Sequence, residues 1–186
     1  MLPSLGGLKR LYLRHFAKPA HDQTLHRFVH QHGVVRIAQC GLGNLERTLR
    51  LIEVAGADNG GQGIELVGFD KFESRAATDG AGLSLKAAHK LLSSKGIKHR
   101  LLPGDPAGSI VAMANSISEV DLLLVSVEHN TSELDRAWFY VPRMLAAGGV
   151  IFLEERQAKA DEFVWRQLTA AELNQRATRP RQRRAA

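Results

Sequence analysis

The chain has 186 residues, of which 44% are hydrophobic and 24% are charged, a composition typical of one globular domain and not of a disordered or fibrous protein. Its single cysteine excludes an intramolecular disulfide, and every apolar run is shorter than the roughly 20 residues that span a bilayer. The N-terminal residues also lack the apolar core of a secretory signal, so we expect a cytoplasmic protein without a membrane span.

The net charge of +6 comes from 25 Lys and Arg against 19 Asp and Glu. Basic residues gather near both ends of the chain, at Lys9, Arg10, Arg14, Lys18, Arg176, Arg179, Arg181, Arg183 and Arg184. Such ends are usually solvated and disordered, and the alternative is a contact with nucleic acid or an anionic surface.

The first 33 residues predict a helical cap, with one helix from Asp22 to His32 that stops at Gly33. From residue 34 onwards, short apolar runs alternate with amphipathic stretches. The runs predict strands at 34–38, 64–69, 97–102, 121–127 and 149–153, and the amphipathic stretches predict helices at 45–55, 83–95, 108–117 and 132–147.

This alternation predicts a doubly wound α/β fold, with a mainly parallel sheet and helices on both faces. The core of the fold is expected to span residues 34–155. A C-terminal helix at 156–175 and a basic, disordered tail at 176–186 are expected to follow it.

Ligands of such sheets bind beyond the carboxyl ends of the strands, where the strand order reverses. Gly41 and Gly43 follow the first strand and open the first helix, where glycine allows close approach to the backbone and the helix offers amide donors. The third glycine of the dinucleotide fingerprint is replaced by Glu46, whose charge opposes a pyrophosphate. The loop therefore favours a cofactor without phosphates.

Two acids follow the next strands. Asp70 ends the second strand, where a carboxylate accepts hydrogen bonds from ribose hydroxyls, and its alternative role is a helix cap or a partner for Lys71. Asp105 follows the third strand and either caps the next helix or contacts an adenine ring.

Further polar residues end the fourth and fifth strands. Glu128 and His129 follow the fourth, and Glu154 and Glu155 end the fifth. This set is suited to a general base or to a hard divalent cation, and the alternative for Glu154 and Glu155 is a solvated edge.

Residues 34–155, about two-thirds of the chain, resemble class I S-adenosylmethionine-dependent methyltransferases, and within them the small O-methyltransferase-like group. The first motif of that family is similar to residues 34–44, VVRIAQCGLGN, and the second-strand motif to residues 67–70, VGFD. The fourth and fifth strands resemble residues 121–129, DLLLVSVEH, and residues 141–155, VPRMLAAGGVIFLEE.

The resemblance implies a Rossmann-like core with strand order 3-2-1-4-5, S-adenosylmethionine as cofactor and a small-molecule acceptor. In the family the glycine loop holds the methionine part of the cofactor, the second-strand acid binds the ribose, and the end of the fourth strand faces the acceptor. Carried onto this chain, the cofactor residues are Gln39, Gly41, Gly43, Asn44, Asp70, Asp105 and Ser126, and the catalytic residues are His129 and Glu128. No residue is assigned to a metal.

The chain also departs from the family pattern. Gln39 stands where the family usually has an acid, and Ser126 where many relatives place an aspartate used for metal or substrate. After the fifth strand, no clear pair of strands completes the seven-stranded sheet of the family. Two functions follow: a methyltransferase, or a binding module that keeps the fold without the catalysis.

Overall fold

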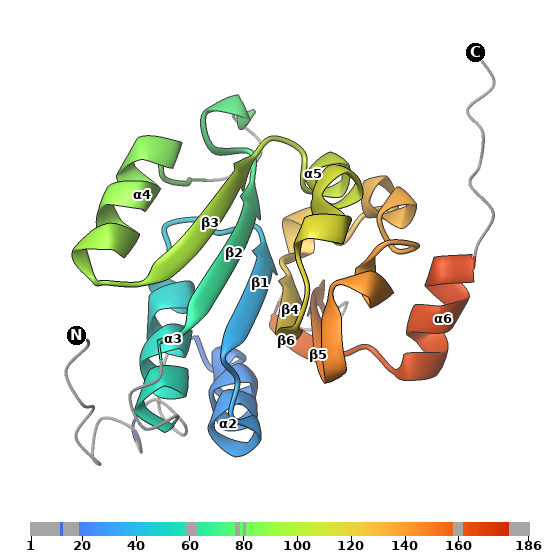
Figure 1. Cartoon of the computed structure of the whole chain (residues 1–186), viewed down its shortest axis with the longest axis horizontal. Helices are drawn as coiled ribbons and strands as arrows, with labels where there is room; N and C mark the ends of the chain where they lie inside the picture. The colour runs from blue at the N-terminus through green and yellow to red at the C-terminus, as the bar shows by residue number, and fades with distance from the viewer. Residues whose placement is uncertain are drawn as a thin grey trace.

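The structure is a computed structural model that describes residues 12, 19–58, 63–76, 79, 81–157 and 162–178 (Figure 1). Residues 1–11 and 13–18 of the predicted N-terminal cap lie outside the described residues, and so do the basic residues from Arg179 onwards. No helix among the described residues is long and apolar enough to cross a membrane.

One six-stranded sheet, in the order β3-β2-β1-β4-β5-β6, forms the centre of the fold. Its strands are β1 (Arg36–Cys40), β2 (Glu65–Asp70), β3 (Lys98–Pro103), β4 (Val120–Val125), β5 (Leu145–Arg156) and β6 (Phe163–Gln167). The first five strands are parallel, which confirms the predicted order 3-2-1-4-5, and β6 runs antiparallel to β5. The order reverses between β1 and β4, whose carboxyl ends therefore lie side by side.

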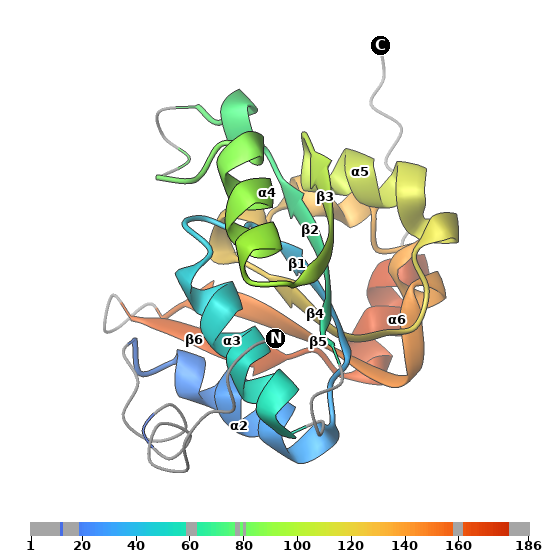
Figure 2. The same ribbon diagram turned by 60° about the vertical axis from the view of Figure 1, so that its left-hand side comes forward.

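Helices cover both faces of the sheet, as predicted. They are α2 (Asp22–His32), α3 (Glu46–Asp58), α4 (Leu85–Ser94), α5 (Pro106–Met113) and α6 (Ala170–Thr178). The helices α2, α3 and α4 lie on one face, while α5 and α6 lie on the other (Figures 1 and 2).

Alternate residues of the strands build two separate cores. Ile37 and Leu122 pack under α2, α3 and α4, whereas their chain neighbours Ala38 and Leu123 face α5 and the turns after β4. All four side chains are buried. Because both faces are covered, the central strands β2, β1 and β4 are mostly apolar, as parallel strands usually are, whereas the edge strand β3 is not.

Side chains at the helix ends explain where the helices begin and stop. The Ser84 hydroxyl accepts the Ala87 N–H at 3.1 Å and caps α4, and Gly33 ends α2 in the left-handed conformation, with φ of 58°.

The predicted C-terminal helix at 156–175 is wrong in its first part. Residues Phe163–Gln167 form the strand β6, which pairs with β5 from Phe152 to Arg156, and only α6 is helical. The physical reason is the open edge of β5, which offers a complete row of backbone partners, and the burial of Trp165 on one side of β6.

The predicted helix at 132–147 is also wrong. This segment forms two short 3₁₀ turns, η4 (Ser132–Arg136) and η5 (Val141–Arg143), after which β5 begins at Leu145. Pro142 cannot donate a backbone hydrogen bond inside a helix, and the segment instead buries Trp138 in the second core.

Two glycines are expected to respond oppositely to substitution by alanine. Gly56 lies inside α3, where an added Cβ would be 3.8 Å from Ile64 Cγ1, an ordinary contact. Gly56→Ala is therefore expected to raise the free energy of unfolding by about 0.5–1 kcal/mol in a urea titration. At Gly149 an added Cβ would lie 2.5 Å from the Val120 carbonyl oxygen, so Gly149→Ala is expected to lower the free energy of unfolding. A stabilising Gly149→Ala would contradict the β4–β5 geometry.

Candidate functional site

A cavity of about 450 Å³ lies beyond the carboxyl ends of β1, β4 and β5. Its floor is the glycine loop, residues 41–44, and its walls come from the start of α2, the first turns of α3 and the residues after β4. Glu154 of β5 and Phe163 of β6 complete it. The volume lies within the roughly 300–1,000 Å³ of small-molecule sites, and the position is the switch point of the sheet.

The glycine loop needs its glycines. Gly41 has φ of 83° and Gly43 has φ of 55°. A Cβ at Gly41 would lie 2.4 Å from Ser126 Oγ and 2.8 Å from Glu128 Oε1, so another residue there would be strained and would displace these side chains. The Ser126 hydroxyl donates to the Cys40 carbonyl at 2.7 Å, which ties the loop to the end of β4.

Gln39 braces this loop from within the core. Its Nε2 donates to the Gly41 carbonyl at 2.8 Å, and its Oε1 accepts from Thr48 Oγ1 at 2.9 Å. An acid at this position could not donate to the Gly41 carbonyl. The amide that departs from the family pattern is therefore used to hold the loop, while still lining the cavity.

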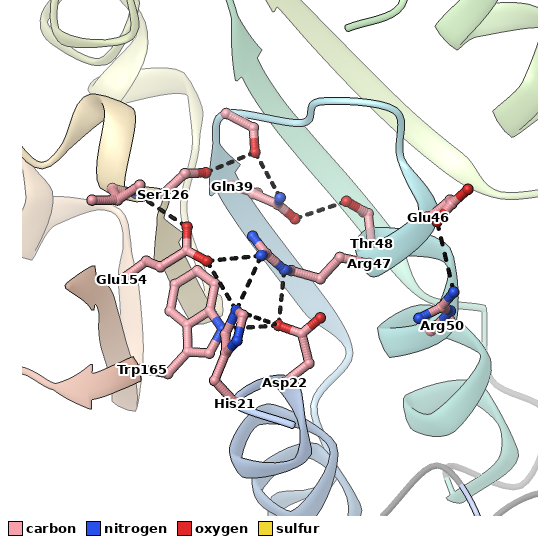
Figure 3. A network of polar contacts seen from close by, with 12 residues as sticks. His21, Asp22, Gln39, Glu46, Arg47, Thr48, Arg50, Ser126, Glu154 and Trp165 are labelled. Atoms are coloured by element: carbon pink, nitrogen blue, oxygen red, sulfur yellow. Dashed lines mark hydrogen bonds and ion pairs between the residues drawn. The ribbon is translucent and has the colours of Figure 1, made fainter. Parts of the chain in front are cut away.

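One wall of the cavity is a half-buried polar network around Arg47 (Figure 3). The guanidinium Nε lies 2.9 Å from Asp22 Oδ1 and Nη2 lies 2.7 Å from Glu154 Oε1. His21 Nε2 lies 3.1 Å from the same Glu154 oxygen, and the Trp165 indole donates to Asp22 at 3.0 Å. The network thus joins α2, α3, β5 and β6.

Sequence reasoning did not assign Arg47, Asp22, His21 or Trp165 to the site. Their only sequence signal is the place of Arg47 in the first turn after the glycine loop. Glu154, a candidate for a metal site or a solvated edge from its sequence position, is only 4% exposed and is paired with His21 and Arg47. Burial acts to raise the pKa of Glu154, but the bonds from His21, Arg47 and the Val127 N–H outweigh it, so the pKa is lowered.

The two predicted catalytic residues lie beside the glycine loop. Glu128 lines the cavity, and burial raises the pKa of its carboxyl group. His129 packs against Gly41, its Nε2 lies 3.5 Å from Glu128 Oε1, and burial lowers the pKa of its imidazole. Near neutral pH, His129 is therefore uncharged and Glu128 is a stronger proton acceptor than an exposed carboxylate.

Asp70 does not line the cavity and is fully engaged. It accepts the backbone N–H groups of Leu42 at 2.6 Å and Phe72 at 2.9 Å, and it forms a two-bonded ion pair with Arg75. Burial acts to raise its pKa, but these four donors lower it. The alternative pair with Lys71 is not formed, because Lys71 pairs with Asp79. The capping alternative is met in part, since Phe72 is the first residue of the 3₁₀ turn η1 (Phe72–Ser74).

Asp105 takes the capping role that was one of its two predicted alternatives. Its Oδ2 accepts the Gly108 N–H at 2.9 Å at the start of α5 and also pairs with Arg136. Of the acids proposed for a metal, Glu154 pairs with Arg47 and Glu155 with Arg166. Within the described ranges no three histidine, cysteine or acidic side chains converge as metal ligands do.

Two of the three non-glycine residues with positive φ in the described part of the chain lie in the loops after β1 and β2, and the third, Glu119, precedes β4. Leu45, just after the glycine loop, has φ of 66°, and Phe72, just after β2, has φ of 46°. Bulky residues rarely adopt the left-handed region, and such conformations concentrate at functional sites. The two strained loops are those of the predicted methionine and ribose contacts.

Glu154 is expected to stabilise the fold in a pH-dependent way. Glu154→Gln is expected to lower the free energy of unfolding at pH 7 by about 1.5–3 kcal/mol, since hydrogen bonds to a charged group are lost. A carboxyl whose folded pKa is depressed stabilises above its unfolded value, here 4.5, and loses this contribution as the pH falls through its folded value.

Urea titrations of both proteins between pH 7 and pH 3 measure this, and the difference between them should shrink below about pH 4.5. The control is Glu46→Gln, which removes the exposed ion pair between Glu46 and Arg50, 3.6 Å apart. It should change the free energy of unfolding by about 0.5 kcal/mol or less. A difference that stays constant down to pH 3 would contradict the assigned ion pairs.

Comparisons with known proteins place the fold. No protein-family model matches the chain, and no curated protein matches its sequence. Among solved structures, a putative caffeoyl-CoA O-methyltransferase from Staphylococcus aureus is similar over 80% of this chain and 66% of its own, at 9% identity and a TM-score of 0.52. The O-methyltransferase TomG from Streptomyces achromogenes, in complex with SAM, is similar over 79% of this chain and 63% of its own, at 15% identity and a TM-score of 0.52.

The trans-methyltransferase CalH, in complex with SAH, is similar over 83% of this chain and 41% of its own, at 19% identity and a TM-score of 0.50. The chain thus spans less than two-thirds of the length of each of these proteins. The likeness concerns the fold, and it confirms the resemblance inferred from the motifs at that level. The chain has the Rossmann-like fold of the class I S-adenosylmethionine-dependent methyltransferases.

Proposed function

We propose that the chain is an S-adenosylmethionine-dependent methyltransferase that acts on a small-molecule acceptor. The observation that carries this proposal is the cavity at the glycine loop, placed at the switch point of the sheet and bordered by Glu128. The fold it shares with methyltransferases supports the same conclusion.

The methionine part of the cofactor fits the residues present. At Gly43 nothing lies within 4 Å of the place of a Cβ, so a ligand can approach the backbone there, while at Gly41 that place is taken by Ser126 and Glu128. Asn44 and Gln39 add polar groups along the cavity. The methionine part carries charges of both signs, and the cavity wall offers both carboxylates and the Arg47 guanidinium.

The adenosine part fits less directly. Asp70 is the proposed ribose ligand, but its carboxylate is already held by Arg75. Asp105 is the proposed neighbour of the adenine, although it caps α5 and pairs with Arg136. Binding of the whole cofactor therefore requires at least the release of Asp70.

The proposed catalysis relies mainly on alignment. The cofactor supplies an activated methyl group, and displacement at carbon depends on the position of the acceptor relative to it. Glu128, whose pKa burial raises, is proposed to accept the proton of a hydroxyl or amine acceptor. His129, neutral near pH 7, is proposed to orient Glu128 or the acceptor, and Ser126 to fix the loop between them.

The second candidate is a binding module without catalysis. The engagement of Asp70 by Arg75 and the use of Gln39 to brace the loop favour it, because both residues satisfy the fold without a ligand. The same cavity would then bind a ligand or remain a structural feature.

Calorimetric titration with S-adenosylmethionine distinguishes the two candidates, and we expect binding. Gly41→Ala should weaken it by about tenfold or more, since the added Cβ would collide with Ser126 and Glu128 and alanine is strained at φ of 83°. Gly63→Ala, where an added Cβ meets nothing within 4 Å, is the matched control and should bind like the wild type. No detectable heat at millimolar cofactor would sink the methyltransferase proposal and leave the binding module.

A further inference from the structure

The carboxylate of Asp70 has no acceptor position left. Oδ2 accepts from the Leu42 N–H and from Arg75 Nη2, while Oδ1 accepts from the Phe72 N–H and from Arg75 Nε at 3.0 Å. A carboxylate offers about four acceptor sites, two on each oxygen. A ribose cannot bind Asp70 unless one kind of donor leaves.

The two kinds of donor differ in how easily they leave. The N–H groups of Leu42 and Phe72 belong to the glycine loop and to the turn after β2, and Gly41, next to Leu42, is itself hydrogen-bonded to Phe69. Arg75, by contrast, reaches Asp70 with a long side chain that has several rotatable bonds. Its departure would free one acceptor on each oxygen, which matches the two neighbouring hydroxyls of a ribose.

The closed position of Arg75 carries a cost. Its side chain is only 10% exposed, and within the described part of the chain its buried Nη1 has no hydrogen-bond partner. A buried donor without a partner loses its hydration and gains nothing in return. The guanidinium is held there by Asp70 on one side and lies against the backbone of Gly82 on the other.

We propose that Arg75 is an internal latch on the ribose site, occupying on Asp70 the two acceptor positions that the ribose hydroxyls of an adenosine ligand would take. This inference rests on the proposed function. The ligand binds only when Arg75 has left Asp70. The apparent dissociation constant is therefore the intrinsic one divided by the fraction of molecules in which Arg75 is displaced. Opening exchanges two bonds from Arg75 for two bonds from the ligand and returns the guanidinium to water.

The first test removes the latch. Arg75→Ala should bind S-adenosylhomocysteine and adenosine about tenfold more tightly than the wild type in calorimetric titrations. Arg36→Ala is the control, because Arg36 also donates two bonds to one carboxylate, Glu65, but at the amino ends of β1 and β2, away from Asp70. It should leave both affinities unchanged.

The second test displaces Arg75 without removing it. A Cβ at Gly82 would lie 1.6 Å from Arg75 Nη1 and 2.2 Å from Cζ, so Gly82→Ala cannot coexist with the closed latch. Gly82→Ala should therefore raise the affinity for S-adenosylhomocysteine and adenosine, as Arg75→Ala does. The double variant should bind no more tightly than Arg75→Ala alone. This variant keeps the proposal testable if Arg75→Ala, which leaves Asp70 with fewer donors, does not fold.

A ligand without the diol gives the last comparison. 2′,3′-Dideoxyadenosine cannot make the two hydroxyl bonds, so neither variant should improve its binding. If the wild type binds S-adenosylhomocysteine and both variants bind it equally or more weakly, the latch is overturned while the methyltransferase proposal stands. If no adenosine ligand binds to any of the proteins, both proposals are overturned.

Discussion

The parallel pairing of β1 with β4 is the constraint on which the candidate site depends. Cys40 lies beside Val125, so the glycine loop that follows β1 and the turn that follows β4 leave the sheet at the same place. Their helices and turns then diverge to opposite faces, which opens the space between them. Ser126 closes the gap at its base by bonding the Cys40 carbonyl, and the rest of the cavity is built around that contact.

The cavity also needs a wall, and Arg47 supplies it by joining four elements. The Arg47 guanidinium is half-buried, and two buried carboxylates share it, with the Trp165 ring 5.1 Å from its Cζ atom. Removing water from these groups makes each partner dependent on the others. The wall therefore ties α2, β5 and β6 to the first turn of α3, which follows the glycine loop.

The sequence predicted the elements whose cause is local or nearly so. Alternating strands and helices, the glycine turn after β1 and the cap role of Asp105 all depend on residues within a few positions of each other. The partners of Arg47 are 25 residues before it and 107 after it, and no spacing rule connects them. β6 was missed because its stability comes from the edge of β5 and from the bond between Trp165 and Asp22, 143 residues away. The pair between Asp70 and Arg75 spans only five residues, but it crosses an irregular turn whose shape follows from the strained Phe72.

The two outer strands of the sheet have a consequence for how the protein behaves at high concentration. β3 ends the sheet on one side, and its free edge carries Lys98, His99 and Arg100 before it closes with Pro103. β6, on the other side, is only five residues long and carries Arg166. Charged and polar residues on an edge strand, and short strands that offer few backbone bonds, make an edge a poor template for a second molecule. Both margins of the sheet therefore carry features that disfavour its growth into an intermolecular β-structure.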